Sequence, residues 1–404
     1  MIDIAVLGYG TIGSGVVEVL DINGDSICKK AGDRINVKYV LDKKDFPGNP
    51  IMEKLVHDVN IILNDPEVRI VVEVMGGTDP AYTYVKEALM RGKSVVTSNK
   101  ELVAKYGAEL IDIAKERNIN FLFEASVGGG IPIIRPLNQS LTADEIVEIT
   151  GILNGTTNYI LTKMADDNMD FATALKDAQR MGYAERDPSA DVEGYDSCRK
   201  IAILSSLAYG MQVDYDDIYT EGISNITQTD IKYAKALNAK IKLFATSVRK
   251  EDDNVYAMVA PVMIRDDHPL YSVSDVFNGI YVRGNVIGDV MFYGRGAGKL
   301  PTASAVVADV VDCAKHLNKN IWTIWSSKKL ELADIEKIKH RFFVRVLKKG
   351  NSFDNIRKMF GQIEEVPEIV ENELAFITPE ITEKEMKDKI ESLNGFIGRI
   401  RVRF

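Results

Sequence analysis

The stretch DPSADVEGYDSCRK, from Asp187 to Lys200, gathers four carboxylates ahead of an Arg-Lys pair, and none of the chain's four histidines lies near it. Histidine is the usual proton carrier near neutral pH. A lysine can replace it only if burial or a neighbouring cation lowers its pKa from ~10.4. Nearby acids act the other way and hold the lysine charged. The group therefore makes sense if something else, such as a substrate ammonium, occupies some of the carboxylates.

The chain before this stretch is predicted to be a helix followed by a loop. Phe171–Met181 has helical spacing, and Gly182 follows it in the position of a C-terminal cap. Pro188 and Gly194 interrupt any further period. The segment from Gly182 to Tyr195 is therefore expected to be a loop.

The next helix is expected to bring an acid and a base together. Asp196 is predicted to cap a helix over Ser197–Tyr209. Lys200 follows it by four residues, so the two side chains share one face. Glu185 and Asp191 lie on the loop before them. Two interpretations stay open at this point, a site for a cationic substrate and a capped helix with solvated charges.

A glycine motif opens the chain. GYGTIG, Gly8 to Gly13, follows the strand candidate Ile2–Leu7 and precedes a helical pattern over Ser14–Leu20. This strand–turn–helix context is what a dinucleotide fingerprint requires. Gly8 permits the tight turn, Gly10 lets a pyrophosphate approach the backbone, and Gly13 allows close packing of helix on strand. We therefore predict a dinucleotide site, the alternative being a purely structural turn.

The end of the second strand bears on the cofactor. Ile35–Leu41 is followed by Asp42, Lys43 and Lys44. An acid here favours the ribose 2′-hydroxyl of NAD, and a base accommodates the 2′-phosphate of NADP. Both charges are present, so NAD and NADP stay open, as does a solvated charge run.

Two later segments also follow strands. Gly76-Gly77 ends the third strand, and Thr97-Ser98-Asn99-Lys100 ends the next. Ligands of open α/β sheets bind at the carboxyl ends of strands. Lys100 is thus expected to face the nicotinamide side of the crevice, unless it is merely solvated.

The segment EASVGGGIP, Glu124 to Pro132, joins a carboxylate to a glycine-rich turn. Such a turn can aim several carbonyl oxygens at one point, which suits a hard cation. From composition alone, an interdomain hinge is the favoured interpretation.

Strands and helices alternate in the first part of the chain. Strands are predicted at Ile2–Leu7, Ile35–Leu41, Arg69–Val74, Ser94–Val96 and Asn120–Phe123, and helices at Ser14–Leu20, Tyr82–Arg91 and Glu101–Arg117. This order is typical of a parallel sheet covered on both faces. We therefore predict an α/β fold that begins with a Rossmann-type domain.

The pattern changes after Gly128–Pro132. Strand candidates Ile146–Leu153, Tyr256–Ile264 and Asn278–Val286 are separated by long helical stretches, which indicates a mixed α+β domain. The tail reads strand, helix, strand, strand, helix, strand, the order of a ferredoxin-like module. We predict a dinucleotide-binding domain over 1–135 with 300–320 packing back on it, a substrate-binding, catalytic and dimerisation domain over 136–299, and a regulatory module over 338–404.

Composition excludes several classes of protein. The 404 residues are 46% hydrophobic and carry a formal net charge of -9, which argues against a nucleic-acid partner. The three cysteines are scattered and show no metal or disulfide spacing. We see no signal peptide and no apolar run near the ~20 residues of a membrane span. The expectation is a cytoplasmic protein without a membrane partner.

The long acidic motif resembles a known family. Ala178-x3-Gly182-Tyr-Ala-x2-Asp187-Pro188-x2-Asp191-Val-x-Gly194-x-Asp196-x3-Lys200 fits the homoserine dehydrogenase signature at every fixed position. GYGTIGSGV, EVMGG, TSNK, FEASVGGGIP, GILNGTTNYIL and MFYGRGAG look like further blocks of that family, in the same order. The resemblance covers roughly residues 1–320.

The resemblance implies an oxidoreductase that interconverts L-homoserine and L-aspartate 4-semialdehyde with NAD or NADP, in threonine and methionine biosynthesis. Lys200 then matches the proton donor and Lys100 a group beside the reacting centre, while Glu185, Asp191 and Asp196 match acids that bind the substrate. The expected cofactor contacts are Gly8, Gly10, Thr11, Ile12, Gly13, Ser98, Lys100, Gly182 and Gly298. Glu124 with the carbonyls of Val127, Gly129 and Ile131 matches a monovalent cation site, usually sodium.

Some features stay open within the resemblance. We hypothesise that Lys100 and Lys200 repel each other, so that Lys200 loses its proton more easily than a lone lysine. The tail resembles an ACT regulatory domain, but Lys348–Ser352 stands where that family usually has Pro-Gly. Glu193 has no predicted role. A homodimer or larger oligomer is implied.

Two other functions compete with this one. One is an oxidoreductase of a different amino or oxo acid on the same cofactor fold. The other is a non-catalytic sensor of nucleotide state, which would need neither Lys100 nor Lys200.

Overall fold

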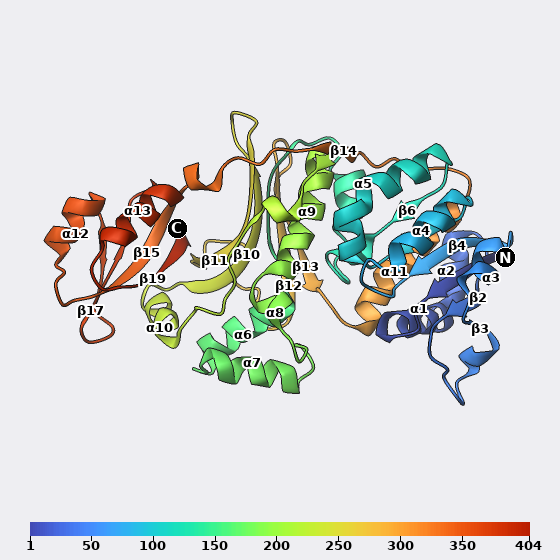
Figure 1. The fold of residues 1–404 in the computed structure, drawn as a ribbon, viewed down its shortest axis with the longest axis horizontal. Helices are drawn as coiled ribbons and strands as arrows, with labels where there is room; N and C mark the ends of the chain where they lie inside the picture. Colours follow the sequence, from blue (N-terminus) through green and yellow to red (C-terminus); the bar gives the residue numbers. More distant parts are fainter.

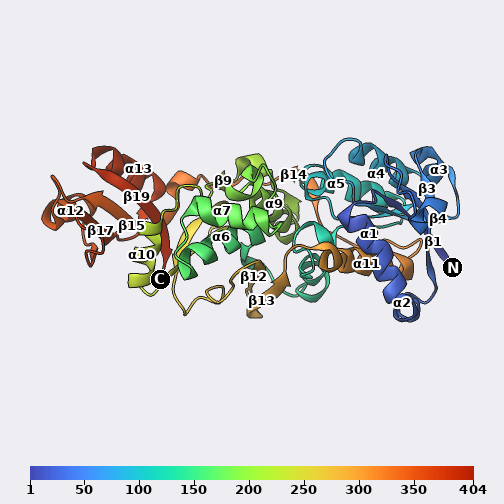
Figure 2. The ribbon, with the colours of Figure 1, turned by 90° about the horizontal axis from the view of Figure 1, so that it is seen from below.

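The computed structural model describes residues 1–404. The chain forms an N-terminal part, a central part and a tail, arranged in a row (Figures 1 and 2). The N-terminus lies at one far end, and the C-terminus lies where the tail meets the central part (Figure 1). No helix of the structure combines the length and the apolar character needed to cross a membrane.

The N-terminal part is built on a parallel sheet. Its strands are β1 (Ile2–Leu7), β2 (Ile35–Leu41), β3 (Leu55–Val56), β4 (Val68–Glu73), β5 (Ser94–Thr97) and β6 (Phe121–Leu122). They form a six-stranded sheet in the order β3-β2-β1-β4-β5-β6. Its helices are α1 (Thr11–Ile22), α2 (Gly24–Ala31), α3 (Val59–Asn64), α4 (Ala81–Met90) and α5 (Lys100–Glu116). β1 and β4 are nearly continuous apolar runs because both of their faces are buried.

A helix from far along the chain packs on this sheet. α11 (Lys299–Lys315) lies against α1, and its Val306 shares a buried cluster with Val16 of α1. The two helices approach closely at Gly15, where an added Cβ would lie 3.0 Å from the Cβ of Ala303. The residues just before α11 are thereby brought beside the N-terminal part.

The central part is an antiparallel sheet with helices on one face. Its strands are β7 (Ile146–Ile152), β10 (Lys240–Arg249), β11 (Val255–Ile264), β12 (Phe277–Gly284) and β13 (Gly288–Arg295). The short β9 (Tyr219–Thr220) pairs in parallel with β11, and the short β8 (Met211–Gln212) pairs outside this sheet with β14 (Ser326–Lys329). The helices are α6 (Gly155–Asp166), α7 (Phe171–Arg180), α8 (Ser189–Val192), α9 (Tyr195–Tyr209) and α10 (Gln228–Ala236). α6, α9 and α10 all pack on β10.

The tail continues that sheet. It contains β14 (Ser326–Lys329), β15 (Lys339–Leu347), α12 (Phe353–Phe360), β16 (Glu364–Val366), β17 (Glu373–Ile377), β18 (Ile381–Thr382), α13 (Glu383–Ser392) and β19 (Phe396–Arg403). β19 pairs in parallel with β11, which gives one sheet in the order β13-β12-β7-β10-β11-β19-β15-β17-β16. The order β19-β15-β17-β16 is that of a ferredoxin-like module. The predicted fold class is thus confirmed.

Buried ion pairs reinforce this joint. Arg401 of β19 donates from Nη1 to Glu221 of the central part at 2.7 Å and from Nε to Glu383 of α13 at 2.5 Å. Arg345 of β15 donates to Asp230 of α10 at 2.6 Å. Loss of one partner of such a pair would leave an uncompensated charge at the contact between the tail and the central part, which is strongly destabilising.

The loop predicted over Gly182–Tyr195 is partly wrong. It contains the short helix α8, which begins right after Pro188 and is closed by a hydrogen bond from Val192 N to the Pro188 carbonyl. Proline breaks a preceding helix but its fixed φ suits the first turn of a new one. Pro188, which was interpreted from the sequence as a helix breaker, therefore precedes the first residue of a new helix.

Candidate active site

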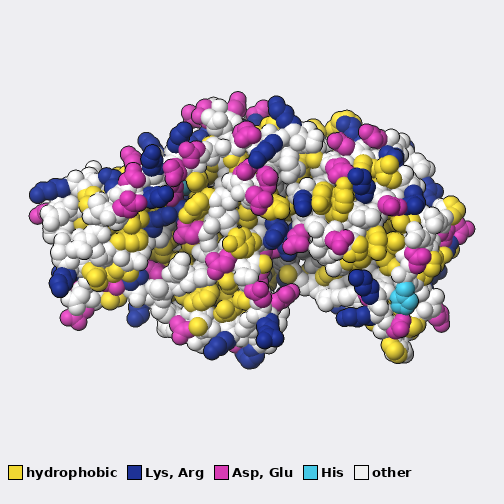
Figure 3. All heavy atoms as spheres, in the orientation of Figure 1, with side chains coloured by type: hydrophobic (Ala, Val, Ile, Leu, Met, Phe, Trp, Pro, Cys, Tyr) yellow, Lys and Arg dark blue, Asp and Glu magenta, His cyan; other side chains and the backbone are white.

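A cleft of about 650 Å³ lies between the N-terminal and central parts. Its walls come from the β5–α5 junction, the β7–α6 junction, the segment from Met181 to Lys200 and the residues before α11. The outline of the molecule is notched between these parts, and charges of both signs are intermixed over the visible face (Figure 3). The predicted residues that line the cleft are Ser98, Lys100, Val127, Gly129, Gly182, Glu185, Asp191, Asp196, Lys200 and Gly298.

Lys100 is held at the cleft by the strand ends beside it. It is the first residue of α5, and Asn99 caps that helix by accepting from Leu102 N at 3.1 Å. The same Asn99 donates to the Gly77 carbonyl at 2.5 Å. Buried Glu73 accepts from Thr97 Oγ1 at 2.6 Å, which ties β4 to β5. These hydrogen bonds fix the backbone position of Lys100 at the carboxyl edge of the sheet.

Asp196 bridges the two predicted lysines. Its Oδ2 lies 2.7 Å from Lys200 Nζ, and its Oδ1 lies 2.8 Å from Lys100 Nζ. Burial acts to raise the pKa of Asp196, but the charges of Lys200 and Lys100 outweigh it and the pKa is lowered. Burial acts to lower the pKa of Lys100, yet Asp196 reverses this and the pKa is raised. The geometry argues against the hypothesis that repulsion between the lysines dominates.

The predicted capping role of Asp196 is wrong. The helix begins at Tyr195, its N-cap is Gly194 with φ of 85°, and no side chain caps it. Asp196 is therefore inside the first turn, and its carboxylate is taken by the lysines and by the amide of Asn154. Charge-assisted hydrogen bonds to the lysines are stronger than a single helix-capping hydrogen bond, so the Asp196 carboxylate contacts the lysines instead.

The other acids of the stretch differ in surroundings. Asp191 on α8 accepts from Asn154 Nδ2 at 2.7 Å, and burial together with the charge of Asp196 raises its pKa. Glu185 lines the cleft as an exposed side chain. Asp187 accepts from Ser189 and begins the turn into α8. Glu193 points elsewhere and accepts from Ser224 Oγ at 2.6 Å.

The glycine motif forms the β1–α1 turn beside the cleft rather than in its lining. Gly8 has φ of +97°, and an added Cβ on Gly13 would lie 1.9 Å from the Gly8 carbonyl oxygen. By contrast, an added Cβ on Gly10 meets nothing within 4 Å. Thr11 and Ile12 open α1. The turn thus leaves open space over Gly10 at a helix N-terminus, the arrangement that binds a pyrophosphate.

Asp42 is fixed next to this turn. Its Oδ2 accepts from Tyr9 N at 2.8 Å, and its Oδ1 accepts from Lys44 N at 3.0 Å. Lys43 and Lys44 are exposed. Of the charged side chains at the end of β2, the Asp42 carboxylate is therefore the one held in place by backbone hydrogen bonds.

Glu124 is buried and already well bonded. Its carboxylate accepts from the backbone N–H groups of Ile133, Ile134 and Arg135 at 2.6, 2.9 and 2.7 Å. The carbonyl oxygens of Val127, Gly129 and Ile131 accept no hydrogen bond from the protein. Orphaned carbonyls in a tight turn fit a hard cation. Within the predicted set, these main-chain carbonyls have no protein donor, whereas both oxygens of the Glu124 carboxylate accept hydrogen bonds.

Asp309 of α11 closes the same region from behind. Its Oδ2 accepts from Glu124 N at 2.8 Å, and its Oδ1 accepts from Arg135 Nη2 at 2.6 Å. Burial and the neighbouring charge of Glu124 raise the pKa of Asp309 to about 8. This carboxyl links α11 to both ends of the segment that connects the N-terminal and central parts.

Sequence reasoning missed two polar side chains of the cleft. Asn154 contacts both Asp191 and Asp196, and Thr156 donates from Oγ1 to the Tyr183 carbonyl at 2.7 Å. Both follow β7 directly, within the block GILNGTTNYIL. The position after a strand was the available signal, as it was for Lys100.

Comparisons with known proteins agree with this geometry. A family model described as "Homoserine dehydrogenase, NAD binding domain" matches residues 8–124, and one described as "Homoserine dehydrogenase" matches residues 132–311. A curated homoserine dehydrogenase of Synechocystis is 48% identical over 319 residues, which is 77% of this chain and 73% of that relative. The chain belongs to the homoserine dehydrogenase family.

Solved homoserine dehydrogenases support the same assignment. The crystal structure of the enzyme from Thiobacillus denitrificans has a TM-score of 0.92 and 34% identity, and covers 100% of this chain and 98% of its own. A hyperthermophilic archaeal homoserine dehydrogenase in complex with NADPH has a TM-score of 0.65 and 28% identity, and covers 77% of this chain and 97% of its own. As a homoserine dehydrogenase, the protein is an oxidoreductase that interconverts L-homoserine and L-aspartate 4-semialdehyde with a nicotinamide cofactor.

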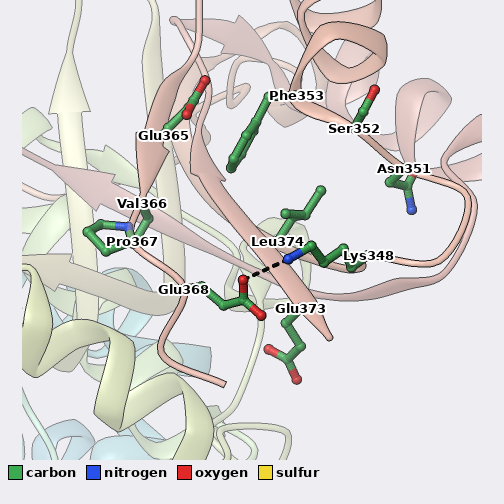
Figure 4. A pocket seen from close by; sticks show the side chains of 10 residues that line it. All are labelled: Lys348, Asn351, Ser352, Phe353, Glu365, Val366, Pro367, Glu368, Glu373 and Leu374. Carbon is green, nitrogen blue, oxygen red and sulfur yellow. Dashed lines mark hydrogen bonds and ion pairs between the residues drawn. The ribbon is translucent and has the colours of Figure 1, made fainter. Parts of the chain in front are cut away.

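This homoserine dehydrogenase has a second cavity in its tail, of about 540 Å³ (Figure 4). It opens at the turn between β15 and α12, where Asn351 and Ser352 lie beside Phe353 (Figure 4). Its lysine, Lys348, is paired with Glu368 at 2.8 Å. Glu373 is paired with Arg345, and Glu365 with Arg357. The charges of this cavity are therefore matched within the tail.

Proposed function

We propose that Lys200 is the acid and base of the reaction and that Lys100 stabilises the developing alkoxide beside it. The observation that carries this proposal is the Lys100–Asp196–Lys200 chain at the cleft, with contacts of 2.8 and 2.7 Å. Lys200 also donates to the Leu153 carbonyl at 2.8 Å, so its Nζ is fixed in position at the cleft. A positioned cation where a carbonyl becomes an alkoxide lowers the barrier electrostatically.

The acids of the cleft supply the substrate site in this proposal. Glu185, Asp191 and Asp196 line one cavity, and a free amino group on the substrate is a cation that such a wall attracts. This accounts for the clustering of carboxylates ahead of a lysine. Glu193 lies outside the proposed site because it is bonded to Ser224.

The cofactor subsites follow the edge of the N-terminal sheet. We assign the pyrophosphate to the turn of Gly8, Gly10 and Gly13 with Thr11 and Ile12, and the nicotinamide end to the cleft beside Ser98, Lys100, Gly182 and Gly298. When bound, the nicotinamide gives or takes the hydride. Asp42 is proposed to face the adenine ribose and to disfavour a 2′-phosphate. Because the archaeal relative was solved in complex with NADPH, the preference for NAD or NADP has to be measured directly.

Three further features belong to the proposal. The carbonyls of Val127, Gly129 and Ile131 are proposed to hold a monovalent cation such as sodium, with the Glu124 side chain bracing the turn from behind. The division into domains at 1–135 with 300–320, 136–299 and 338–404 is proposed with the last as an ACT-like module. We also propose a homodimer or larger assembly in the cytoplasm.

The test is homoserine-dependent reduction of NAD+ and NADP+ by the purified protein, with and without sodium. We expect turnover with homoserine and none with hydroxy acids that lack the α-amino group. Equal rates on those hydroxy acids would contradict the proposed acidic substrate wall. Unchanged activity after exchange of sodium for a bulky organic cation would contradict the cation site.

A further inference from the structure

The junction between β7 and α6 contacts the charged groups of the cleft. The Leu153 carbonyl accepts from Lys200 Nζ at 2.8 Å. The Asn154 amide nitrogen Nδ2 donates to Asp191 Oδ1 at 2.7 Å and to Asp196 Oδ2 at 2.9 Å. Its oxygen Oδ1 accepts from Thr157 N at 2.8 Å, which caps α6. Asn154 is only 6% exposed.

An amide between two carboxylates has a clear physical consequence. Asp191 and Asp196 come from different helices, α8 and α9, and like charges repel when they approach. A primary amide has two N–H groups in one plane, so one side chain can satisfy both acids at once. A hydroxyl has a single donor, and a carboxylate at the same place would add a third like charge.

We propose that Asn154 is a positioning residue for this reaction, whose amide holds Asp191 and Asp196 at a fixed spacing as a paired acceptor for the substrate ammonium. The inference rests on the proposed substrate roles of those two acids. Charged groups that share the cavity with the pair are Lys100, Glu101, Glu185, Asp187, Arg199, Lys200 and Arg295. The Asn154 amide donates only to the two acids.

A capping role for Asn154 can be separated from the positioning role. Asn154→Ser and Asn154→Asp both keep a side-chain oxygen that can accept from Thr157 N, and both residue types are good N-caps. Both remove the amide donors. For Asn154→Ser we expect the homoserine KM to rise by roughly 10-fold or more, because hydrogen bonds to charged groups are lost. The cofactor KM should stay within about twofold, since the cap and the β1–α1 turn are untouched.

Asn154→Asp gives an electrostatic signature. It is nearly isosteric with asparagine, so it keeps the test decisive if the serine variant folds poorly. At neutral pH we expect a higher homoserine KM than for the serine variant, because three carboxylates face one another. Lowering the pH should bring that KM back toward the wild-type value, because the introduced carboxyl group, once protonated, donates one hydrogen bond again. The wild-type protein should show no such recovery.

Control variants distinguish failure of this inference from failure of the proposed function. Asp170→Ser changes the cap of α7, which accepts from Thr173 N at 2.7 Å outside the cleft, and should leave all constants unchanged. Asp191→Asn and Asp196→Asn should each raise the homoserine KM. If those two variants behave like wild type, the proposed substrate site fails. If they are impaired while both Asn154 variants keep the wild-type homoserine KM at every pH, Asn154 is a cap only and the inference is overturned.

Discussion

Lys200 Nζ lies 2.7 Å from Oδ2 of Asp196, one turn earlier on α9. Both side chains are buried, and the other oxygen of the same carboxylate holds Lys100. One carboxylate thereby holds the Nζ atoms of both lysines at the cleft. In the proposed mechanism, Lys200 delivers a proton to the aldehyde oxygen in the reductive direction.

Lys200→Ala should abolish most turnover without loss of cofactor binding. General acid catalysis contributes roughly 10²–10⁴-fold, so kcat should fall by at least about 100-fold. Steady-state rates and a fluorescence titration with the reduced cofactor measure the two quantities. The matched control is Lys176→Ala, which removes an exposed lysine on α7 and should leave kcat and cofactor binding unchanged. Near-normal turnover of the Lys200 variant would remove this residue from the role.

Two glycines of the β1–α1 turn should respond differently to alanine. Gly13→Ala forces a Cβ to 1.9 Å from the Gly8 carbonyl oxygen, so the melting temperature should drop and cofactor binding should fail with it. Gly10→Ala meets no protein atom within 4 Å, so stability should hold while the cofactor KM rises at least about 10-fold.

Gly24→Ala, which also meets nothing within 4 Å, controls for a harmless methyl group. Thermal unfolding and cofactor titration of the three variants give the comparison. An unchanged cofactor KM in Gly10→Ala would mean that no pyrophosphate approaches this turn.

Asp42→Asn should shift the cofactor choice toward NADP. The ordered carboxylate repels a 2′-phosphate and accepts a ribose hydroxyl, and the amide does neither as well. The ratio of kcat/KM with NADP+ to that with NAD+ should rise about 10-fold or more. Lys43→Ala, which removes an adjacent exposed charge, should not raise this ratio. A constant ratio in the Asp42 variant would place the adenine ribose elsewhere.

Asp309 should make the folded state lose stability as the pH rises. Its pKa is raised to about 8 in the fold by burial and by Glu124, against an ordinary value of 3.8. Between these values the native state holds a proton that the unfolded chain has released, so the free energy of unfolding falls with rising pH.

Asp309→Asn removes this titration, and its unfolding free energy should depend less on pH, by up to about 1.4 kcal/mol per pH unit. Urea unfolding across mildly acidic to mildly alkaline pH tests this. Parallel slopes for the two proteins would show that Asp309 stays ionised throughout.

The sequence predicted those features that depend only on residues close together in the chain. The β1–α1 turn and the strands β1 and β2 follow from glycine geometry and hydrophobic pattern, and the structure has them at the predicted places. The convergence of Lys100 with Asp196 could be read only through the family resemblance. These residues are far apart in the chain, and no local pattern reports a contact between two folding parts.

The sequence did not predict which hydrogen-bond partner a polar side chain takes when several are available. Asp196 is a good capping residue by type, but two lysines and an amide take its carboxylate instead. The Glu124 carboxylate accepts from three backbone N–H groups of a later segment, which the sequence did not indicate. Asn154 is a good capping residue by type and does cap α6, with its amide left over for the acids. Such choices depend on which groups the tertiary fold brings near.

The parallel pairing of β11 with β19 has a consequence for the life of the nascent chain. Val262–Ile264 of β11 are paired by residues 401–403, which are synthesised long afterwards. Until then the central sheet presents an apolar strand with an open edge, the kind of surface that recruits other strands. We expect the ribosome-bound protein to need protection from the time β11 has been made until β19 pairs with this edge.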